Sequence, residues 1–242
     1  MQLSRTDLKT YSSLKRKSKR LENGLFIAEG AKVCQELLES EFTIENFFCT
    51  EENLNEFPNA TLISNKDAGR ISNQKNHSGI LAIVKTPDNT QNTLDFSKDI
   101  IVLENINDPG NLGTIMRTLD WFGYSQLICS ENSVDTFNPK TIMASMGSVF
   151  RIQPHYLNIS NFLSNTKNES YGTFMKGKSL FETQFKNPSI IVFGNESHGI
   201  SHELSEKINS KISIPGAGKA ESLNLSNSLS IVISEHYKNR NN

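Results

Sequence analysis

The sequence predicts an α/β protein made of two domains, and three features of the 242-residue chain point to that class. Short apolar runs alternate with amphipathic helical patterns through the carboxy-terminal part, which is typical of α/β folds. Three of these runs end in turns rich in glycine, asparagine or proline. A polar segment, KTPDNTQNTLDFSKD, has the composition of an exposed linker. We therefore expect one domain over residues 1–90 and a second over residues 91–242.

The amino-terminal domain should combine helices with short strands. Its pattern predicts a first helix, a strand over 25–28, a helix over 31–39, further short strands and a closing strand over 80–84. This is the composition of a small α/β domain.

Basic side chains are concentrated at the amino terminus, although the whole chain carries a formal net charge of −1. Residues 1–20 hold seven basic side chains and one acidic one, which gives a local charge of +6. Such a stripe can bind the phosphate backbone of a nucleic acid, and a solvated helix face is the alternative. The candidate RNA-contacting residues are Lys15, Arg16, Lys17, Lys19 and Arg20.

Elements of the carboxy-terminal domain follow one another as strand, turn and helix. Strands are expected over 100–103, 126–129, 171–175, 190–193 and 211–214. Helices are expected around Gly113, from Pro139 with Asn138 as N-cap, after Ser201, and from Ser222 onward.

The first of the three turns lies within residues 102–123, where an apolar run ends at Glu104 and an amphipathic helix follows. Three- and four-residue spacing predicts that one face of this helix is buried, formed by Leu112, Ile115, Met116, Leu119 and Phe122. Asn111 and Arg117 should therefore stay near the loop. Because open α/β sheets bind ligands outside the carboxyl ends of their strands, this turn is the first candidate site.

Two further turns have the same form. The apolar strand over 190–193 runs into GNESHG, where flanking glycines permit close approach of the backbone to a ligand. The strand over 211–214 runs into PGAGK, and Glu221, Ser222 and Asn224 lead into the last helix. Any one of these turns, taken alone, is more often an ordinary connection between a strand and a helix.

Together, the three turns resemble the motifs of the SpoU (TrmH-type) RNA ribose 2′-O-methyltransferases of the SPOUT superfamily. DPGNLGTIMRT is similar to the first motif, FGNESHGIS to the second and IPGAGKAESLNLS to the third, in the family's order. NPKTIMASMGSVFR is similar to a further family segment. LKRKSKRLENGLFIAEGAKV resembles the small α/β RNA-binding domain that many members carry. The resemblance covers nearly the whole chain.

The resemblance implies that the second domain forms a deep trefoil knot. The implied methyl donor is S-adenosylmethionine, bound in the knotted loops by Gly194, Ile214 and Leu223, with Thr173 in a further wall. Members act as homodimers through the knotted domain. In such a dimer, serines at four-residue spacing on the last helix would allow close helix approach, and an ordinary solvated face is the alternative.

The family's catalytic residues, carried onto this chain, are Arg117, Asn111, Glu196, Ser222 and Asn224. The resemblance gives Arg117 the role of base at the ribose 2′-hydroxyl. Because the pKa of arginine lies above about 12, stabilising the alkoxide and fixing an RNA phosphate is chemically easier, and both roles stay open. Asn111 should hold substrate and loop geometry, and Glu196 should order the second turn. Ser222 and Asn224 should fix the third.

The implied function is S-adenosylmethionine-dependent methylation of a ribose in RNA. The appended RNA-binding domain favours ribosomal RNA over transfer RNA. A catalytically silent RNA-binding protein on the same scaffold is the alternative class, and retention of the catalytic side chains argues against it.

Several other classes are disfavoured by composition. No apolar stretch approaches the roughly 20 residues that span a bilayer, and the amino terminus lacks the apolar core of a secretory signal, so we expect a cytoplasmic protein that does not enter membranes. The three cysteines are too far apart for a zinc or disulfide framework, and no metal is implied. We assign no acid or base role to His198 or His202, and His236 belongs to no visible constellation.

Overall fold

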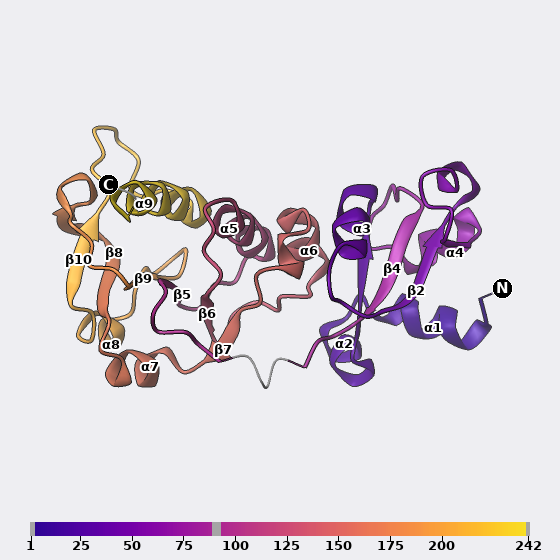
Figure 1. The fold of residues 1–242 in the computed structure, drawn as a ribbon, viewed down its shortest axis with the longest axis horizontal. Coiled ribbons are helices and arrows are strands. Elements are labelled where there is room, and N and C mark those ends of the chain that lie inside the picture. The colour runs from indigo at the N-terminus through magenta and orange to yellow at the C-terminus, as the bar shows by residue number, and fades with distance from the viewer. Residues whose placement is uncertain (1–2, 89–92, 241–242) are drawn as a thin grey trace.

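Two α/β domains lie end to end in the computed structural model, which describes residues 3–88 and 93–240 (Figure 1). The domain boundary predicted near residue 90 lies outside the described residues. Within the described ranges, no helix is both long enough and apolar enough to cross a membrane.

The amino-terminal domain is built on a four-stranded sheet in the order β1-β4-β2-β3. Its strands are β1 (Leu25–Glu29), β2 (Ile44–Cys49), β3 (Thr61–Leu62) and β4 (Ile80–Lys85), and its helices are α1 (Arg5–Ser13), α2 (Lys17–Asn23), α3 (Ala31–Leu38) and α4 (Asn65–Ile71), with a 3-10 turn η1 at Glu51–Asn53. β4 pairs antiparallel with both β1 and β2, and its residues 80–84 are all buried. This central place explains its unbroken apolar run.

Six parallel strands form the sheet of the second domain, in the order β10-β8-β9-β5-β6-β7. Its strands are β5 (Ile100–Leu103), β6 (Leu127–Ser130), β7 (His155–Leu157), β8 (Glu169–Ser179), β9 (Ser189–Phe193) and β10 (Ser210–Ser213). Its helices are α5 (Pro109–Trp121), α6 (Pro139–Ser145), α7 (Ile159–Asn165), α8 (His202–Ser205) and α9 (Leu225–Arg240), with 3-10 turns η3 (Ser148–Phe150) and η4 (Leu180–Glu182). Because the strands are parallel, the turns after β5, β9 and β10 all open at one edge.

Each face of this sheet has its own apolar core, because alternate residues of a strand point to opposite sides. Ile101 and Leu103 of β5 belong to a cluster with residues of α5 and α9, whereas Ile100 and Val102 belong to a cluster with residues of α7 and α8. Figure 1 shows α5 and α9 on one face and α7 and α8 on the other. The helices thus cover both faces and leave the edge with the motif turns open.

The predicted strands and helices of the second domain are present, with some differences at their ends. The last helix begins at Leu225 rather than Ser222, because residues 215–224 form an exposed loop and the Asn224 side chain accepts a hydrogen bond from Ser226 N–H at 2.9 Å. β8 continues to Ser179, beyond its predicted end. β7 and α7 were not predicted. The three residues of β7 are too few to show an apolar pattern, and the seven of α7 make only two turns of helix. The implied knot stays a prediction.

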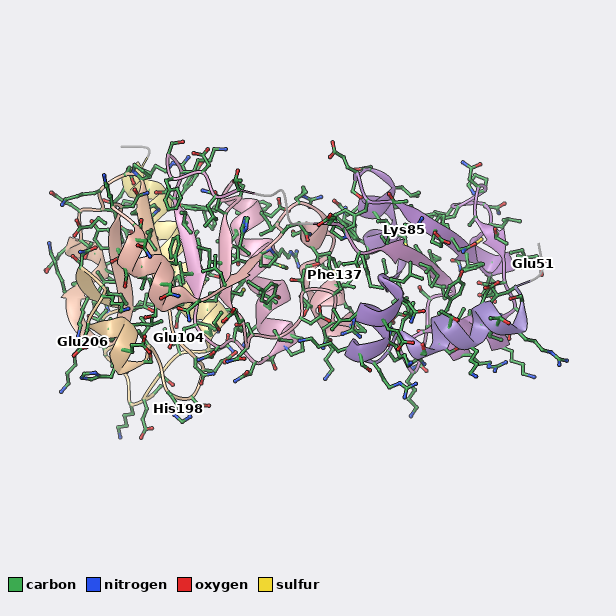
Figure 2. The ribbon with its side chains drawn as sticks, turned by 90° about the horizontal axis from the view of Figure 1, so that it is seen from below. Glu51, Lys85, Glu104, Phe137, His198 and Glu206 are labelled. Carbon is green, nitrogen blue, oxygen red and sulfur yellow. The ribbon has the colours of Figure 1, made fainter. Side chains whose placement is uncertain are left out.

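The two domains share one apolar core. Phe26 of β1 stacks on Phe137, which precedes α6, with ring centroids 4.3 Å apart, and Phe42 packs edge-on against Phe150 at 5.2 Å. All four side chains belong to or pack against the cluster that also contains the α5 and α9 residues. Figure 2 shows Phe137 between the two domains. Aromatic burial therefore holds them together.

One predicted RNA contact is corrected by this arrangement. Arg20 is only 5% exposed, and its guanidinium binds the carboxylate of Asp135 in the second domain and the main-chain oxygens of Leu14 and Lys15. Charge counting could not separate Arg20 from its basic neighbours, because the partner carboxylate is 115 residues away in sequence. Arg20 is thus a contact within the protein and is not available to RNA.

Candidate active site at the carboxyl edge of the parallel sheet

The first motif turn is fixed by capping and by its neighbour β6. The Asp108 side chain accepts a hydrogen bond from Asn111 N–H at 2.9 Å, and Pro109 occupies the first turn of α5. This combination begins the helix and leaves the Asn111 side chain at the edge of the sheet. Asn105 has a φ of 50° and donates its N–H to the hydroxyl of Ser130 at 2.7 Å. The turn is therefore held from both sides.

Asn111 connects the three motif turns. Its Nδ2 donates to Glu196 Oε1 at 3.2 Å, and its Oδ1 accepts from Asn224 Nδ2 at 3.1 Å. The Asn224 side chain also accepts from Ser226 N–H at 2.9 Å at the start of α9. Three segments from distant parts of the chain thus meet at one edge of the sheet, as the motif order predicts.

The second motif turn folds back on its own backbone. Asn195 and Gly199 exchange main-chain hydrogen bonds of 3.0 and 2.9 Å, and the Asn195 side chain donates to Asn105 O at 2.7 Å. A Cβ at Gly194 would lie 2.0 Å from the carbonyl carbon of Gly199, so only glycine fits there. The turn is tightly constrained at its start.

Two residues of this edge were not predicted from the sequence. Asn195 ties the second turn to the first, and Glu104, 7% exposed, accepts from Ser201 N–H at 2.8 Å at the start of α8. A charged residue at the end of a fully apolar strand was the available signal for Glu104. Glu104 holds the end of the second motif turn against β5.

The third motif turn is fixed by Asn224 and not by Ser222. Residues 215–224 are all exposed, and within the part of the chain that the structure describes, Ser222 makes no hydrogen bond. The loop is therefore anchored by β10 and Ile214 at its amino end and by Asn224 at its carboxyl end.

Arg117 stands apart from the Asn111 network. It lies six residues beyond Asn111 on α5, which places it about 9 Å further along the helix and on another side. Its side chain is exposed and, among the described residues, has neither a hydrogen bond nor an ion pair. Asn111 and Arg117 therefore point to different sides of α5. Trp121, four residues further on, is 84% exposed.

The residues assigned to the cofactor lie on or after three adjacent strands. Gly194 follows β9, Ile214 follows β10, and Thr173 of β8 donates its hydroxyl to Val192 O at 3.3 Å. Leu223 is 50% exposed in the third loop. This region combines the exposed backbone of the third loop with the exposed apolar side chain of Leu223.

In the segment expected to contact RNA, three cations have no ion pair among the described residues. Lys15, Arg16 and Lys17 are exposed and have no ion pair within the described residues. Lys19 is partly exposed and binds Glu22 at 2.5 Å. Arg20 is buried, as described above.

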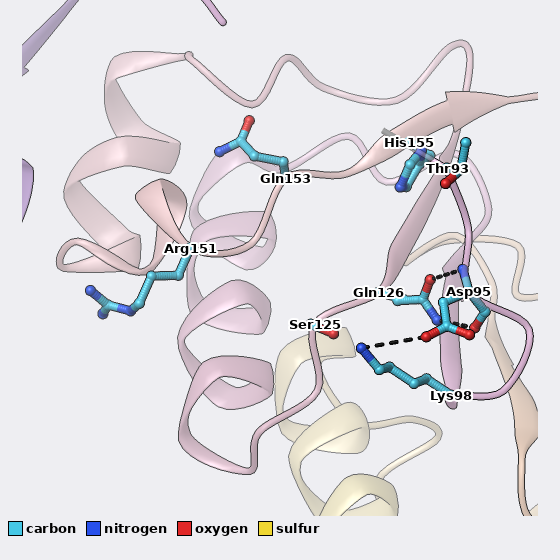
Figure 3. Close-up of a pocket in the computed structure, with 8 residues that line it drawn as sticks. All are labelled: Thr93, Asp95, Lys98, Ser125, Gln126, Arg151, Gln153 and His155. Atoms are coloured by element: carbon cyan, nitrogen blue, oxygen red, sulfur yellow. Dashed lines mark hydrogen bonds and ion pairs between the residues drawn. The ribbon is translucent and has the colours of Figure 1, made fainter. Parts of the chain in front are cut away.

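A hollow of about 440 Å³ lies at the opposite edge of the sheet (Figure 3). Gln126, which precedes β6, exchanges hydrogen bonds of 2.7 and 2.6 Å with the Asp95 backbone there. The hollow is lined by polar residues: Thr93, Asp95, Lys98, Ser125, Gln126, Arg151, Gln153 and His155. No residue of the three motif turns lines it, so we place the candidate site at the carboxyl edge. Among the described residues, no three His, Cys, Asp or Glu side chains are grouped to hold a metal.

Comparison with known proteins agrees with this geometry. Residues 98–234 match the SpoU rRNA Methylase family, and residues 5–82 match the MRM3-like substrate binding domain. The chain belongs to the SpoU rRNA methylase family. Its first, second and third turns are the segments that the Asn111 network joins.

Relatives, two of them of known structure, match over both domains of this SpoU family chain. A TrmH-family protein from Porphyromonas gingivalis is 32% identical, has a TM-score of 0.85, and matches over 97% of this chain and 98% of its own. An AdoMet-bound rRNA methyltransferase from Sinorhizobium meliloti is 26% identical, has a TM-score of 0.82, and matches over 97% and 96%. The 23S rRNA (guanosine(2553)-2′-O)-methyltransferase RlmP of Bacillus subtilis is 25% identical over 235 residues, 93% of this chain and 94% of that protein.

Proposed function

We propose that this SpoU family chain transfers a methyl group from S-adenosylmethionine to a ribose 2′-hydroxyl of ribosomal RNA. The observation that carries the proposal is the hydrogen-bonded line of Glu196, Asn111 and Asn224, which joins the three motif turns at one edge of the parallel sheet. The Bacillus subtilis relative is named for this reaction on 23S rRNA, and the Sinorhizobium meliloti structure holds AdoMet.

The residues on β8 and just after β9 and β10 fit an adenosine-containing ligand. The third loop is exposed and open, with nothing within 4 Å of a Cβ built at Gly216 or Gly218, and Leu223 offers apolar surface. Gly194 and Ile214 complete this region with backbone groups and a half-buried side chain. When bound, the donor supplies a methyl group already activated on a sulfonium.

The protein's own contribution is to order these loops and to provide a cation for the RNA. Asn111 uses both its side-chain donor and its acceptor on other motif residues, so its role is to hold the loops in register. Arg117 has no hydrogen-bond or ion-pair partner among the described residues, and its guanidinium is exposed. Its guanidinium would bind an RNA phosphate and stabilise the alkoxide that develops on the ribose oxygen.

Ribosomal RNA is favoured over transfer RNA as the substrate. The amino-terminal match is to a substrate binding domain, and Lys15, Arg16 and Lys17 of that domain are exposed cations. Release of counterions from an RNA backbone would drive binding there. A separate domain of this size suits an RNA that is gripped at a distance from the methylated nucleotide.

We also propose that the active form is a homodimer in which the exposed side of α5 faces a second copy. Trp121 is 84% exposed on the same side of α5 as Arg117, and a tryptophan left in water favours an interface. On α9, Ser226 is buried and Ser230 binds Thr118 at 3.1 Å within the chain, whereas Ser234 is exposed.

The test combines cofactor binding with methyl transfer. Calorimetry should show S-adenosylmethionine binding, and the purified protein should then transfer labelled methyl to total RNA from a strain that lacks the gene. Mass spectrometry of the ribosomal RNA would locate a 2′-O-methyl ribose. Cofactor binding without transfer to any RNA would instead indicate a silent RNA-binding protein, and label in transfer RNA alone would refute the ribosomal substrate.

A further inference from the structure

A buried arginine joins the basic segment of the amino-terminal domain to the methyltransferase domain. Arg20 Nε donates to Asp135 Oδ2 at 3.1 Å, and its Nη2 pairs with the same oxygen. Its Nη1 donates to Leu14 O at 3.0 Å and to Lys15 O at 3.2 Å. One guanidinium therefore binds a carboxylate of one domain and two main-chain carbonyls of the other.

The carboxylate partner is connected to the motif turns. Asp135 lies in the loop between β6 and α6, where the preceding residue, Val134, donates its N–H to Ile106 O at 2.8 Å. Asn105, next to Ile106 in the first motif turn, accepts a hydrogen bond from the Asn195 side chain of the second. Protein contacts thus run without a break from the basic segment to the motif turns.

The chemistry of this contact indicates that it fixes the relative orientation of the two domains, in addition to any effect on stability. Burying a charged pair costs desolvation, and an apolar pair would hold two domains together equally well. A guanidinium differs in that its planar fork fixes the directions of several partners at once. Arg20 uses that fork on the main-chain carbonyls of Leu14 and Lys15. Lys15 is the first of the three exposed cations, and Arg16 and Lys17 follow it directly.

We propose that Arg20 is a positioning residue: with Asp135 it holds the basic turn of residues 14–17, and RNA bound there, in a fixed register with the motif turns. The part of this proposal that concerns RNA rests on the proposed function. The part that concerns the register of the two domains does not.

Distances between spin labels test the register directly. Ser18→Cys lies beside the basic turn, and Glu206→Cys lies at the far end of the second domain, where Glu206 is 70% exposed. All three native cysteines are buried, so labels attach to the introduced ones. We expect a narrow distance distribution by pulsed electron paramagnetic resonance in the parent protein, and a clearly broader one with Arg20→Gln or with Asp135→Asn.

Lys19→Gln is the matched control. It removes one positive charge from the same segment, but the Lys19 ammonium binds only Glu22 of its own helix among the described residues. We expect this variant to keep the narrow distribution. Folding of each variant is checked by circular dichroism, and Asp135→Asn serves if Arg20→Gln does not fold. Distributions as narrow in both Arg20→Gln and Asp135→Asn as in the parent would overturn the proposal.

Methyl transfer to total RNA then tests the consequence. We expect Asp135→Asn to lower kcat about tenfold, because a displaced ribose seldom meets the donor. The RNA concentration that gives half the maximal rate should change by less than about twofold, because the exposed cations remain. The affinity for S-adenosylmethionine should be unchanged. An unchanged kcat despite a broader distribution would refute the role in catalysis. If the parent itself methylates no RNA, the proposed function fails, while the label distances still decide the register.

Discussion

Arg117 is the residue whose replacement should affect turnover most. Its guanidinium is exposed and has no protein partner among the described residues, so any change there acts on substrate and not on the fold. Arg117→Lys keeps the charge but loses the planar fork, and we expect kcat to fall about 100-fold. Affinity for S-adenosylmethionine, measured by calorimetry, should stay the same. Near-normal turnover in this variant would show that Arg117 is not the catalytic residue.

Gly194 should be intolerant of any side chain. A Cβ there would lie 2.0 Å from Gly199 C and 2.1 Å from Ile200 N, so Gly194→Ala must displace the second motif turn. We expect a lower melting temperature and about tenfold weaker binding of S-adenosylmethionine, a change of about 1.4 kcal/mol. Gly216→Ala, with nothing within 4 Å of its new Cβ, is the control and should leave the melting temperature unchanged. Equal melting temperatures for the two variants would contradict this account.

At the scale of elements, the motif turns could be predicted because each is a local strand, loop and helix. Asn138 and Ser201 cap their helices as expected, and the three turns meet at Asn111. The position of Arg117 could have been anticipated from helical period alone, since six residues on α5 do not bring a side chain back to the same side.

The last helix, α9, is held by a buried histidine that the sequence did not reveal. His236 is fully buried, with Nδ1 2.6 Å from Tyr124 Oη and Nε2 2.8 Å from Ser189 Oγ. Burial lowers the pKa of His236 to about 4, which the nearby Asp99 opposes and Arg240 reinforces. Its partners are 112 and 47 residues away, so no local pattern shows the cluster.

The lowered pKa of His236 predicts a loss of stability in mild acid. The unfolded chain protonates His236 near its ordinary pKa of 6.5, while the folded chain resists protonation down to about 4. The stabilising effect of the neutral ring is therefore complete above pH 6.5 and is lost as the pH falls toward 4, by a few kcal/mol in total. Melting temperatures between pH 7 and pH 5 should fall more steeply for the parent than for His236→Gln. Parallel curves would contradict the assignment.

At the scale of the whole molecule, the two domains and their order could be predicted, but their contact could not. Composition marks the linker, and the basic segment marks one surface of the first domain. The interface depends on pairs such as Phe26 with Phe137 and Arg20 with Asp135, which lie more than 100 residues apart and use ordinary residue types. Arg20 was therefore assigned to RNA with its neighbours, although three dimensions place it inside the protein.

The exposed side of α5 should decide whether the protein is a dimer. Trp121 is 84% exposed there, so Trp121→Glu would put a charge into the proposed interface, where desolvation disfavours it. We expect light scattering to show a dimer for the parent and a monomer for Trp121→Glu. Leu62→Glu is the control, because Leu62 is 56% exposed on β3 of the other domain and should leave the dimer intact. Because Arg117 lies on the same side of α5 as Trp121, away from the Asn111 network of its own chain, the monomer should also lose methyl transfer. A Trp121→Glu variant that remains dimeric would exclude this surface as the interface.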